Sequence, residues 1–397
     1  MDNNISDFPG KENISPKKWM RQQRIKRLKT RIYTILIVLF LILAVVIAYF
    51  TYERTKVYSN LECVNSVAFS TSESASITEF AGSILSYSKD GAQSTDSEGN
   101  LLWNQTFDMQ NPMSSICGNT VAFADYGGSV IYVQTKDAEG YEINTDMPIR
   151  KITVSDKGIV AAILEDVNVT WIYLYDSNGE QIACFRTTME NSGYPVDFDI
   201  SPSGELVGVS YYYLDIGDVK SSVAFYNFGD VGQNNIDNYV SGYNYKDSLV
   251  PIVRFLSNSN VFALSSERLT IYKGAQKPVS NQEIFLSEDV LSVFYDEPYI
   301  GVVFRNNDGD SEYRLVVYSA DGEKLSEKEF DFDYSAVVFG NGQYALYGNT
   351  DVCISTVNGK VKFEKQYGKS VRLMIPTASP TKYVIVTDSS IDTVQMK

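Results

Sequence analysis

The chain has 397 residues, of which 44% are hydrophobic, and its net charge is −15. It contains no histidine, which excludes catalytic triads with an imidazole base and metal centres with histidine ligands. Residues 1–31 carry a net charge of +6, so the rest of the chain carries −21. Because so acidic a segment repels nucleic acid, we expect no DNA or RNA partner.

Residues 1–31 form a basic tail that we expect in the cytoplasm. Residues 1–16 are polar, include two prolines and are typical of disorder. Residues 17–31 carry eight Lys/Arg and no acidic residue, and they predict a helix with one apolar side. The positive-inside rule places these charges on the cytoplasmic side. They could also attract anionic lipids of the inner leaflet.

Residues 32–52 predict a transmembrane signal-anchor helix. The stretch Ile32–Phe50 has 19 residues without a charge, Gly or Pro, and a helix of that length spans roughly 28 Å, close to the hydrocarbon core of a bilayer. A cleaved signal peptide has a shorter apolar run that ends in small residues. Here Tyr49, Phe50 and Tyr52 follow, which is typical of an interfacial aromatic belt. We therefore expect Ile32–Phe50 to contact the lipid bilayer, and the C-terminal part to be extracytoplasmic.

Residues 57–397 predict a single all-β domain. Runs of four to eight residues rich in Val, Ile, Tyr and Phe alternate with clusters of Gly, Asn, Asp and Ser. Turns of one type recur at steps of 37 to 50 residues. A repeating unit of about 40–45 residues with four short strands is typical of a β-propeller blade. The glycines of these turns are Gly99, Gly140, Gly179, Gly229, Gly274, Gly322 and Gly359.

The number of blades depends on how the two ends of the domain combine. Seven turns are compatible with seven blades. Residues 371–395, however, predict three strands that lack a fourth, and residues 61–70 predict a strand without a blade of its own. Joined together, they would form an eighth blade that closes the ring and removes its free sheet edges. We therefore favour eight blades over seven.

The segment Asp96–Trp103 carries the pattern D-x-x-G-x-x-x-W. This pattern resembles the repeat of quinoprotein-like (PQQ-like) propellers, in which the Trp docks between blades. The whole layout resembles an uncharacterised family of membrane-anchored, quinoprotein-like and WD-repeat-like propeller proteins from Gram-positive bacteria. The resemblance implies a fold and a topology but no activity. No quinone cofactor or metal is expected, because Trp103 is better explained as a docking residue than as the stacking partner of a cofactor.

Several polar stretches are candidate sites. Asp197 with Asp199, and Asp331 with Asp333, place two carboxylates on one side of a strand. Such a pair could act as acid and base, but Asp at these positions usually accepts hydrogen bonds from backbone amides. Residues 306–312 resemble a calcium loop without its twelve-residue spacing, which favours a solvated turn. The four cysteines match no metal pattern, and we expect them to be buried free thiols.

The best local candidate for binding is the segment from residue 211 to about residue 248, which we expect to be an irregular insertion. It contributes to the longest step between turn glycines, 50 residues, and combines tyrosines with Asn, Gly and Ser. Exposed Tyr beside amide groups is common at protein- and sugar-binding surfaces. A polar hairpin with ordinary packing tyrosines remains the alternative. The candidate binding residues are Tyr211, Tyr212, Tyr213, Tyr239, Tyr243 and Tyr245.

These features favour an interaction scaffold at the cell envelope that binds a protein or a glycan. One alternative is a carbohydrate-active envelope enzyme that uses carboxylates at the propeller axis. Another is an envelope sensor coupled to the cytoplasmic tail. An enzyme predicts an axial pocket with converging Asp and Glu, whereas a scaffold predicts an open face of Tyr and Asn. We assign no catalytic residue and do not expect an enzyme.

Overall fold

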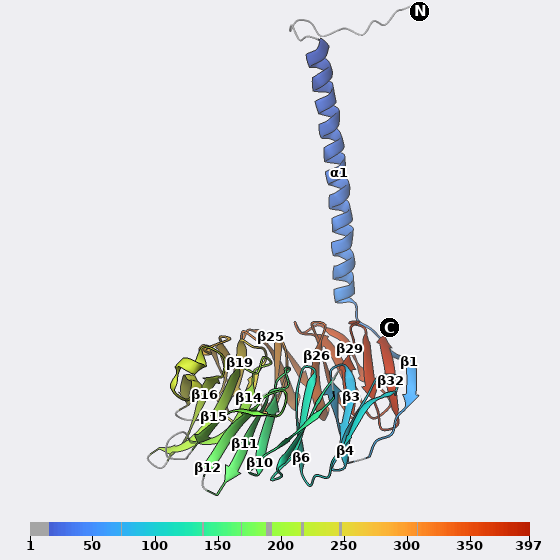
Figure 1. Ribbon diagram of the computed structural model, residues 1–397. Helices are drawn as coiled ribbons and strands as arrows, with labels where there is room; N and C mark the ends of the chain where they lie inside the picture. Colours follow the sequence, from blue (N-terminus) through green and yellow to red (C-terminus); the bar gives the residue numbers. More distant parts are fainter. Residues whose placement is uncertain are drawn as a thin grey trace, which may run out of the picture. The chain divides into compact units, whose positions relative to one another are not determined.

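The computed structural model describes residues 16–72, 74–136, 139–167, 169–187, 193–215, 218–245, 248–307 and 309–397. The tail predicted to be disordered lies outside these residues, apart from Pro16. The chain divides into two units, Met1–Val57 and Tyr58–Lys397. The first contains a helix and the second a β-propeller (Figure 1).

Helix α1 runs from Pro16 to Thr55 and is longer than predicted, because the basic run and the apolar stretch form one continuous helix. Its segment Ile25–Val46 is long and apolar enough to cross a membrane, and its side chains are exposed. Apolar side chains exposed on every side of a helix are suited to lipid and not to water. A membrane span or signal anchor is therefore possible by length and composition, while the orientation of the helix stays a prediction.

Eight four-stranded antiparallel sheets form the propeller, and the first strand of each blade is the innermost. Blade 1 holds β2 (Ser76–Phe80), β3 (Ser83–Tyr87), β4 (Gly91–Thr95) and β5 (Leu101–Thr106). Blade 2 holds β6 (Pro112–Cys117), β7 (Thr120–Asp125), β8 (Val130–Thr135) and β9 (Tyr141–Asn144). Blade 3 holds β10 (Ile149–Val154), β11 (Val160–Asp166), β12 (Val169–Tyr175) and β13 (Gln181–Thr187). Blade 4 holds β14 (Tyr194–Ile200), β15 (Leu206–Asp215), β16 (Asp218–Asn227) and β17 (Tyr239–Tyr245), with the short 3-10 helices η1 (Gly232–Asn234) and η2 (Ile236–Asn238) before β17.

The remaining four blades complete the ring. Blade 5 holds β18 (Ile252–Phe255), β19 (Asn260–Leu264), β20 (Arg268–Lys273) and β21 (Val279–Phe285). Blade 6 holds β22 (Val290–Asp296), β23 (Tyr299–Arg305), β24 (Tyr313–Ser319) and β25 (Lys324–Phe330). Blade 7 holds β26 (Tyr334–Gly340), β27 (Gln343–Gly348), β28 (Asp351–Thr356) and β29 (Val361–Gln366). Blade 8 holds β30 (Leu373–Pro376), β31 (Lys382–Val386), β32 (Ser390–Met396) and β1 (Leu61–Ala68).

Blade 8 confirms the predicted closure by the two ends of the domain. Strand β1 pairs antiparallel with β32, from Leu61 opposite Met396 to Ala68 opposite Ser390. The carboxylate of Asp392 on β32 accepts hydrogen bonds from Ser66 of β1 (2.5 Å), Tyr367 (2.7 Å) and Lys369 (2.7 Å). This one buried side chain therefore joins β1, β32 and the connection that leaves blade 7.

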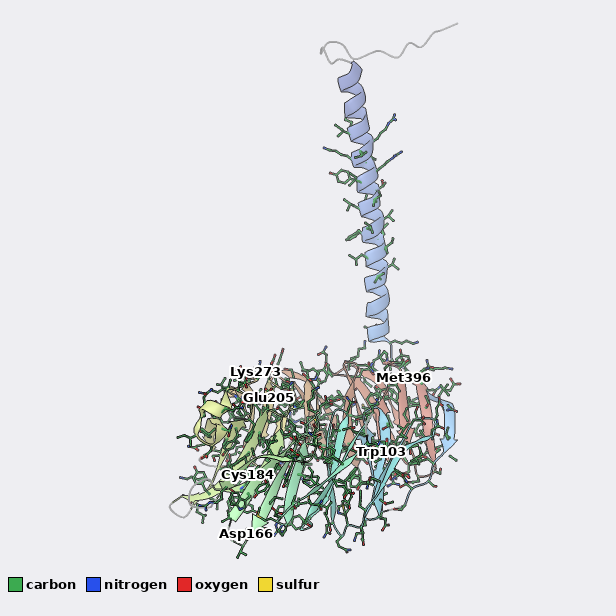
Figure 2. The ribbon with its side chains drawn as sticks, in the orientation of Figure 1. Trp103, Asp166, Cys184, Glu205, Lys273 and Met396 are labelled. Carbon is green, nitrogen blue, oxygen red and sulfur yellow. The ribbon has the colours of Figure 1, made fainter. Side chains whose placement is uncertain are left out.

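The core lies between blades and not within them. The buried apolar residues form eight clusters, and each cluster contains residues of two neighbouring blades. Alternating side chains of a strand point to opposite faces, so each blade contributes to two clusters. Trp103 (Figure 2) packs edge-on against Phe80 at a centroid distance of 6.1 Å, beside the cluster that joins blades 1 and 2.

The recurring Asp-x-x-Gly turn has a clear local cause. In the first copy, Asp96 Oδ1 accepts the backbone N–H groups of Glu98 (2.8 Å) and Asn100 (2.9 Å). Gly99 has a φ of +84°, and a Cβ there would lie 2.9 Å from the Val67 side chain of β1. The turn therefore requires Gly for its backbone conformation and for its close approach to blade 8. Of the predicted turns, the one before Gly140 includes residues 137 and 138, which lie outside the described residues.

Candidate functional site

The fourth blade is longer than its neighbours. Strands β15 and β16 have ten residues each, whereas the other strands have four to eight. The prediction of an irregular insertion from residue 211 is therefore wrong for most of its length, because Tyr211 to Asp215 continue a regular strand. Within the described part of this segment, residues 228–238, which contain η1 and η2, form the irregular stretch between the strands.

Two of the six candidate tyrosines belong to the core. Tyr211 is 1% exposed, and its hydroxyl lies 3.0 Å from that of Tyr226. Tyr245 is 2% exposed, and its hydroxyl lies 2.7 Å from that of Tyr272. Burial raises the pKa of both Tyr211 and Tyr245. The prediction that these two residues bind a partner is wrong, because they are enclosed by neighbouring side chains.

The other four tyrosines differ in how far solvent reaches them. Tyr243 is half-buried and donates a hydrogen bond to the Pro278 carbonyl at 3.1 Å, so it also joins blades 4 and 5. Tyr212 and Tyr213 are half-buried on the hairpin, and Tyr239 is 47% exposed. The Tyr212 ring lies 5.4 Å from that of Tyr194, which holds it in place.

Sequence reasoning missed the apolar residues near the end of the β15–β16 hairpin. Leu214 and Val219 lie opposite each other in the register, and they are 63% and 49% exposed. Tyr212 shares their side of the hairpin, because side chains two residues apart on a strand share a face. We call Tyr212, Leu214 and Val219 the hairpin surface. In the sequence, the hairpin surface is indicated only by Leu214 and Val219, each next to an Asp residue. The same pattern is compatible with a buried strand.

The hairpin surface lies on the face of the propeller opposite to Tyr58. In each blade, the first and second strands are connected at one face of the propeller, and the second and third strands at the opposite face. The chain enters β1 at the face that carries the connections between first and second strands. The β15–β16 hairpin is such a second turn. The hairpin surface is therefore separated from the start of the propeller by the full height of a blade.

A cavity of about 920 Å³ lies on the propeller axis, lined by innermost strands and the turns that follow them. Every blade contributes to its lining, and its ionisable residues are Glu79, Cys117, Asp156, Tyr295, Asp296 and Glu297. It continues past Phe255 and Tyr295 into a second cavity of about 450 Å³, which is lined by blades 1 to 6. The axis of the propeller is thus hollow over much of its length.

Two Asp residues of β14 lie at the second cavity. Asp199 lines it, and Asp197 forms an ion pair with the lining residue Arg254. Asp197 accepts the Val253 N–H at 2.8 Å and forms ion pairs with Lys151 and Arg254. Asp199 accepts the Phe255 N–H and the Thr153 hydroxyl, at 2.8 and 2.7 Å.

Both Asp residues therefore satisfy backbone amides of the next innermost strand, as the sequence favoured. Asp331, after β25, instead accepts the Glu312 N–H of the β23–β24 connection in its own blade, at 2.8 Å.

Three pKa shifts describe the electrostatics of the axis. Burial raises the pKa of Asp199, although the nearby Arg254 opposes the shift. Burial and the Glu79 carboxylate raise the pKa of Asp296 to about 6. Burial, Asp199 and Asp156 raise the pKa of the Cys117 thiol to about 11. Asp296 has an exposed surface, but the surrounding protein removes part of the hydration of its carboxylate, which disfavours the ionised form.

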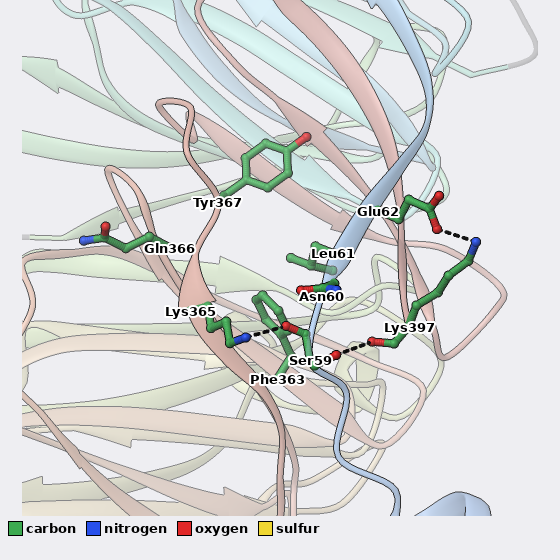
Figure 3. Close-up of a pocket in the computed structure, with 9 residues that line it drawn as sticks. All are labelled: Ser59, Asn60, Leu61, Glu62, Phe363, Lys365, Gln366, Tyr367 and Lys397. Carbon is green, nitrogen blue, oxygen red and sulfur yellow. Dashed lines mark hydrogen bonds and ion pairs between the residues drawn. The ribbon is translucent and has the colours of Figure 1, made fainter.

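A groove of about 500 Å³ lies between blades 7 and 8 (Figure 3). Its lysines are already engaged. Lys365 Nζ donates to the Ser59 carbonyl at 2.7 Å, and Lys397 forms an ion pair with Glu62. The Ser59 N–H in turn donates to the Lys397 carbonyl at 2.9 Å. The groove therefore belongs to the closure of the ring and offers no free charge of its own.

The cysteines differ from the expectation of four buried thiols. Cys63 on β1 and Cys184 on β13 are exposed, Cys117 is half-buried and Cys353 is buried (Figure 2 labels Cys184). The expectation is wrong for the first two, because both lie on outermost strands that no further strand covers. The stretch 306–312 connects β23 to β24, and its residue 308 lies outside the described residues.

The family of this chain follows from its sequence match. Residues 54–396 match DUF5711, a family of unknown function. The chain belongs to this family. No curated protein matches the sequence. The match spans the whole propeller, and it confirms the prediction of an uncharacterised propeller family.

Solved structures share the fold at low sequence identity. A eukaryotic initiation factor aligns with a TM-score of 0.53 and 14% identity, covering 84% of this chain and 87% of that one. Chaetomium thermophilum Sqt1, bound to the N-terminus of the ribosomal protein L10, aligns with a TM-score of 0.53 and 11% identity, covering 85% of this chain and 100% of that one. BamB from Moraxella catarrhalis aligns with a TM-score of 0.49 and 12% identity, covering 85% of this chain and 98% of that one. At these identities the likeness concerns the fold alone.

Proposed function

We propose that this DUF5711 protein is a membrane-anchored, extracytoplasmic interaction scaffold that binds a protein or a glycan of the cell envelope. The observation that carries the proposal is the hairpin surface, where Leu214 and Val219 are 63% and 49% exposed on strands longer than all others. Exposed apolar side chains grouped on a protruding element are typical of interaction sites. Tyr212 adds a rigid aromatic ring that can bind at low entropic cost.

The rigidity of the supporting blade favours the same use. Tyr211 and Tyr226 are hydrogen-bonded beneath the hairpin, so the backbone that carries Leu214 continues from a packed core. Binding residues are often found on connections held by a rigid scaffold. Sqt1, which has this fold, binds a segment of another protein. That example supports the proposal only in showing that a propeller can serve such a role.

The proposed location rests on helix α1 and on the division of charge. The segment Ile25–Val46 has the length and composition of a membrane span. The charge of +6 on residues 1–31 and of −21 on the rest of the chain favours a cytoplasmic N-terminus and an extracytoplasmic propeller. The sensor alternative depends on the tail 1–31, of which residues 1–15 lie outside the described part of the chain.

The test compares two matched double variants of the full chain in cells that produce it. Leu214→Ser with Val219→Ser removes the apolar part of the hairpin surface. Leu101→Ser with Leu102→Ser removes equally exposed apolar residues from β5 of blade 1, at 57% and 52% exposure. After crosslinking, we expect the first variant to lose specific co-purified partners that the second keeps. Equal partner sets in both variants and the wild type would count against the proposal.

An axial enzyme is a second candidate, because carboxylates of Glu79, Asp156, Asp296 and Glu297 line the axial cavity. Burial and the Glu79 carboxylate raise the pKa of Asp296 to about 6, and a carboxyl group with a raised pKa can act as the general acid of a glycoside hydrolase. The test is hydrolysis of purified cell-wall glycan by the full chain. An activity that disappears in Asp296→Asn would favour this candidate, and absence of activity in the wild type would dismiss it.

A further inference from the structure

The second axial cavity, of about 450 Å³, differs in charge from the rest of the propeller. The chain beyond residue 31 carries a net charge of −21, yet two of the three charged residues in this lining are cations, Lys151 and Arg254. The third is Asp199, whose pKa is raised by burial. Behind the lining, Asp197 forms ion pairs with both cations. The two cations therefore face one full negative charge and one carboxyl group whose ionisation is disfavoured.

Both cations have N–H groups that the protein does not use. The Lys151 ammonium has three N–H donors, and one of them binds Asp197. The Arg254 guanidinium has five, of which two at Nη1 go to Asp197 at 2.5 Å and to the Val253 carbonyl at 2.6 Å. The Tyr295 hydroxyl accepts a further hydrogen bond from the same guanidinium. Within the described part of the chain, two N–H donors of each cation therefore remain without an acceptor.

Hydroxyl groups line the same cavity. Ser76 and Thr78 come from β2, and Ser114 and Ser115 come from β6. Ser115 Oγ accepts the Val154 N–H at 3.1 Å, which leaves its own hydrogen free to donate. The hydroxyls of Ser76, Thr78 and Ser114 form no hydrogen bond with any other described residue. The cavity thus combines cationic donors with hydroxyls that can both donate and accept.

Aromatic side chains complete the lining. Tyr87, Phe198, Phe255 and Tyr295 contribute ring surface from four different blades. Pockets for small molecules typically have volumes of about 300–1,000 Å³ and combine apolar walls with a few placed polar groups. A cavity of about 450 Å³ with this lining suits a small molecule that has a carboxylate, several hydroxyls and apolar ring faces.

We propose that the second axial cavity binds a sugar acid, with Lys151 and Arg254 holding its carboxylate and the Ser and Thr hydroxyls binding its ring hydroxyls. The planar fork of an Arg side chain matches the geometry of a carboxylate, and a Lys ammonium adds a second charged donor. The apolar C–H faces of the sugar ring would contact Phe255 and Tyr295. This site uses neither the hairpin surface nor the carboxylates of the larger cavity, so it goes beyond both candidate functions.

The test is calorimetric titration of the purified full chain in detergent at pH 7 and low ionic strength. The probes are D-glucuronate, D-glucose, which has the same ring without the carboxylate, and inorganic phosphate. None of them has a glycosidic bond, so hydrolysis cannot contribute to the heat. D-glucuronate should bind at least about tenfold more tightly than D-glucose, since hydrogen bonds to charged groups contribute roughly that factor.

Three outcomes of this titration would overturn the proposal. They are an absence of D-glucuronate binding, equal binding of the two sugars, and tighter binding of phosphate than of D-glucuronate. The second would show that the cations do not recognise the carboxylate. The third would show that they bind small anions without regard to the sugar ring.

Two cavity variants localise the binding. Lys151→Gln removes one charge but keeps an N–H donor for Asp197, and it should raise the Kd for D-glucuronate about tenfold. Thr78→Val removes one hydroxyl at nearly constant volume, and it should raise the Kd about threefold, because a neutral hydrogen bond contributes less. If Lys151→Gln lowers the melting temperature, Thr78→Val decides the result.

The matched control is Lys273→Gln. The Lys273 side chain (labelled in Figure 2) is 37% exposed, compared with 36% for Lys151, and it pairs with Asp321 away from the lining of the cavity. This variant should leave the Kd unchanged. An unchanged Kd in both cavity variants, or an equal loss of affinity in Lys273→Gln and Lys151→Gln, would disprove the site.

Discussion

At the scale of single residues, buried carboxylates connect strands that backbone ladders leave unconnected. Asp197 and Asp199 accept N–H groups from the innermost strand of blade 5, where no sheet hydrogen bond joins the two blades. Asp392 joins β32 in the same way to the connection after β29, and it also accepts a hydrogen bond from Ser66 on its sheet partner β1. A carboxylate suits these places because it accepts several hydrogen bonds at once.

Asp392→Asn should lower the free energy of unfolding by about 2 kcal/mol at pH 7, since hydrogen bonds to charged groups contribute roughly 1.5–3 kcal/mol. Burial alone would raise the pKa of Asp392, but hydrogen bonds from Lys369, Ser66 and Tyr367 lower it overall. The stability it provides is therefore complete above the unfolded-state pKa of about 3.9 and is lost as the pH falls through the lower folded-state pKa. Urea unfolding at pH 7, 5, 4 and 3 measures this.

The control is Asp388→Asn in the β31–β32 connection, where the carboxylate is exposed and lies 3.9 Å from Arg372. It should change stability little at any of these pH values. A difference between wild type and Asp392→Asn that persists unchanged at pH 3 would contradict the assigned role of the carboxylate.

The tyrosines show where single residues escape sequence reasoning. The composition correctly identified a Tyr-rich segment. Tyr211 and Tyr212, however, are neighbours of the same type in the sequence and differ in their burial in the fold. Tyr211 is buried because Tyr226 and the cluster between blades 3 and 4 cover it, whereas Tyr212 is only half-buried. Which residue a neighbouring blade covers depends on contacts between distant parts of the chain. The same holds for Glu79, Asp156 and Asp296 of the axial cavity, which come from blades 1, 3 and 6 and share no sequence motif.

At the scale of elements, the spacing of turns was sufficient to predict the blades. The Asp-x-x-Gly turns are visible because their geometry requires particular residues, as at Asp96 and Gly99. The unpaired strand at residues 61–70 was sufficient to predict the closing blade. The length of the β15–β16 hairpin could not be predicted, because polar residues of an extended hairpin and of an irregular loop have similar composition.

Removal of strand β1 should destabilise the propeller far more than removal of the N-terminal segment. A chain that begins at Ser72 lacks β1 and the Ser66 hydrogen bond to Asp392, and it exposes the edge of β32. We expect its melting temperature to fall by more than about 10 °C relative to a chain that begins at Tyr52, because a loss of several kcal/mol lowers it by that much. Thermal unfolding followed by circular dichroism measures this. Equal melting temperatures would mean that β1 does not close the ring.

At the scale of the whole molecule, the ring distributes its core over eight interfaces between blades. Loss of any one sheet would open such a ring. The ring also has a hollow axis and an outer surface, and the two differ in chemistry. The axis is acidic, whereas the hairpin surface is apolar.

Membrane topology is testable with reagents that modify thiols and do not cross membranes. Because Cys63 and Cys184 are exposed, the background should carry Cys63→Ser and Cys184→Ser. In intact cells stripped of their wall, Ser97→Cys should be labelled and Ser6→Cys should not, since nine basic residues precede the apolar stretch. Labelling of Ser6→Cys alone would reverse the proposed orientation.

The most direct measurement for the interaction scaffold is photo-crosslinking in living cells. A photoreactive amino acid replaces Leu214 in one full-length variant and Leu101 in another, two leucines of similar exposure on different blades. The account predicts a discrete crosslinked product from position 214, which disappears when Val219→Ser is added, and no such product from position 101. Absence of a product at position 214, or the same products at both positions, would contradict the claim that the fourth blade carries the binding surface.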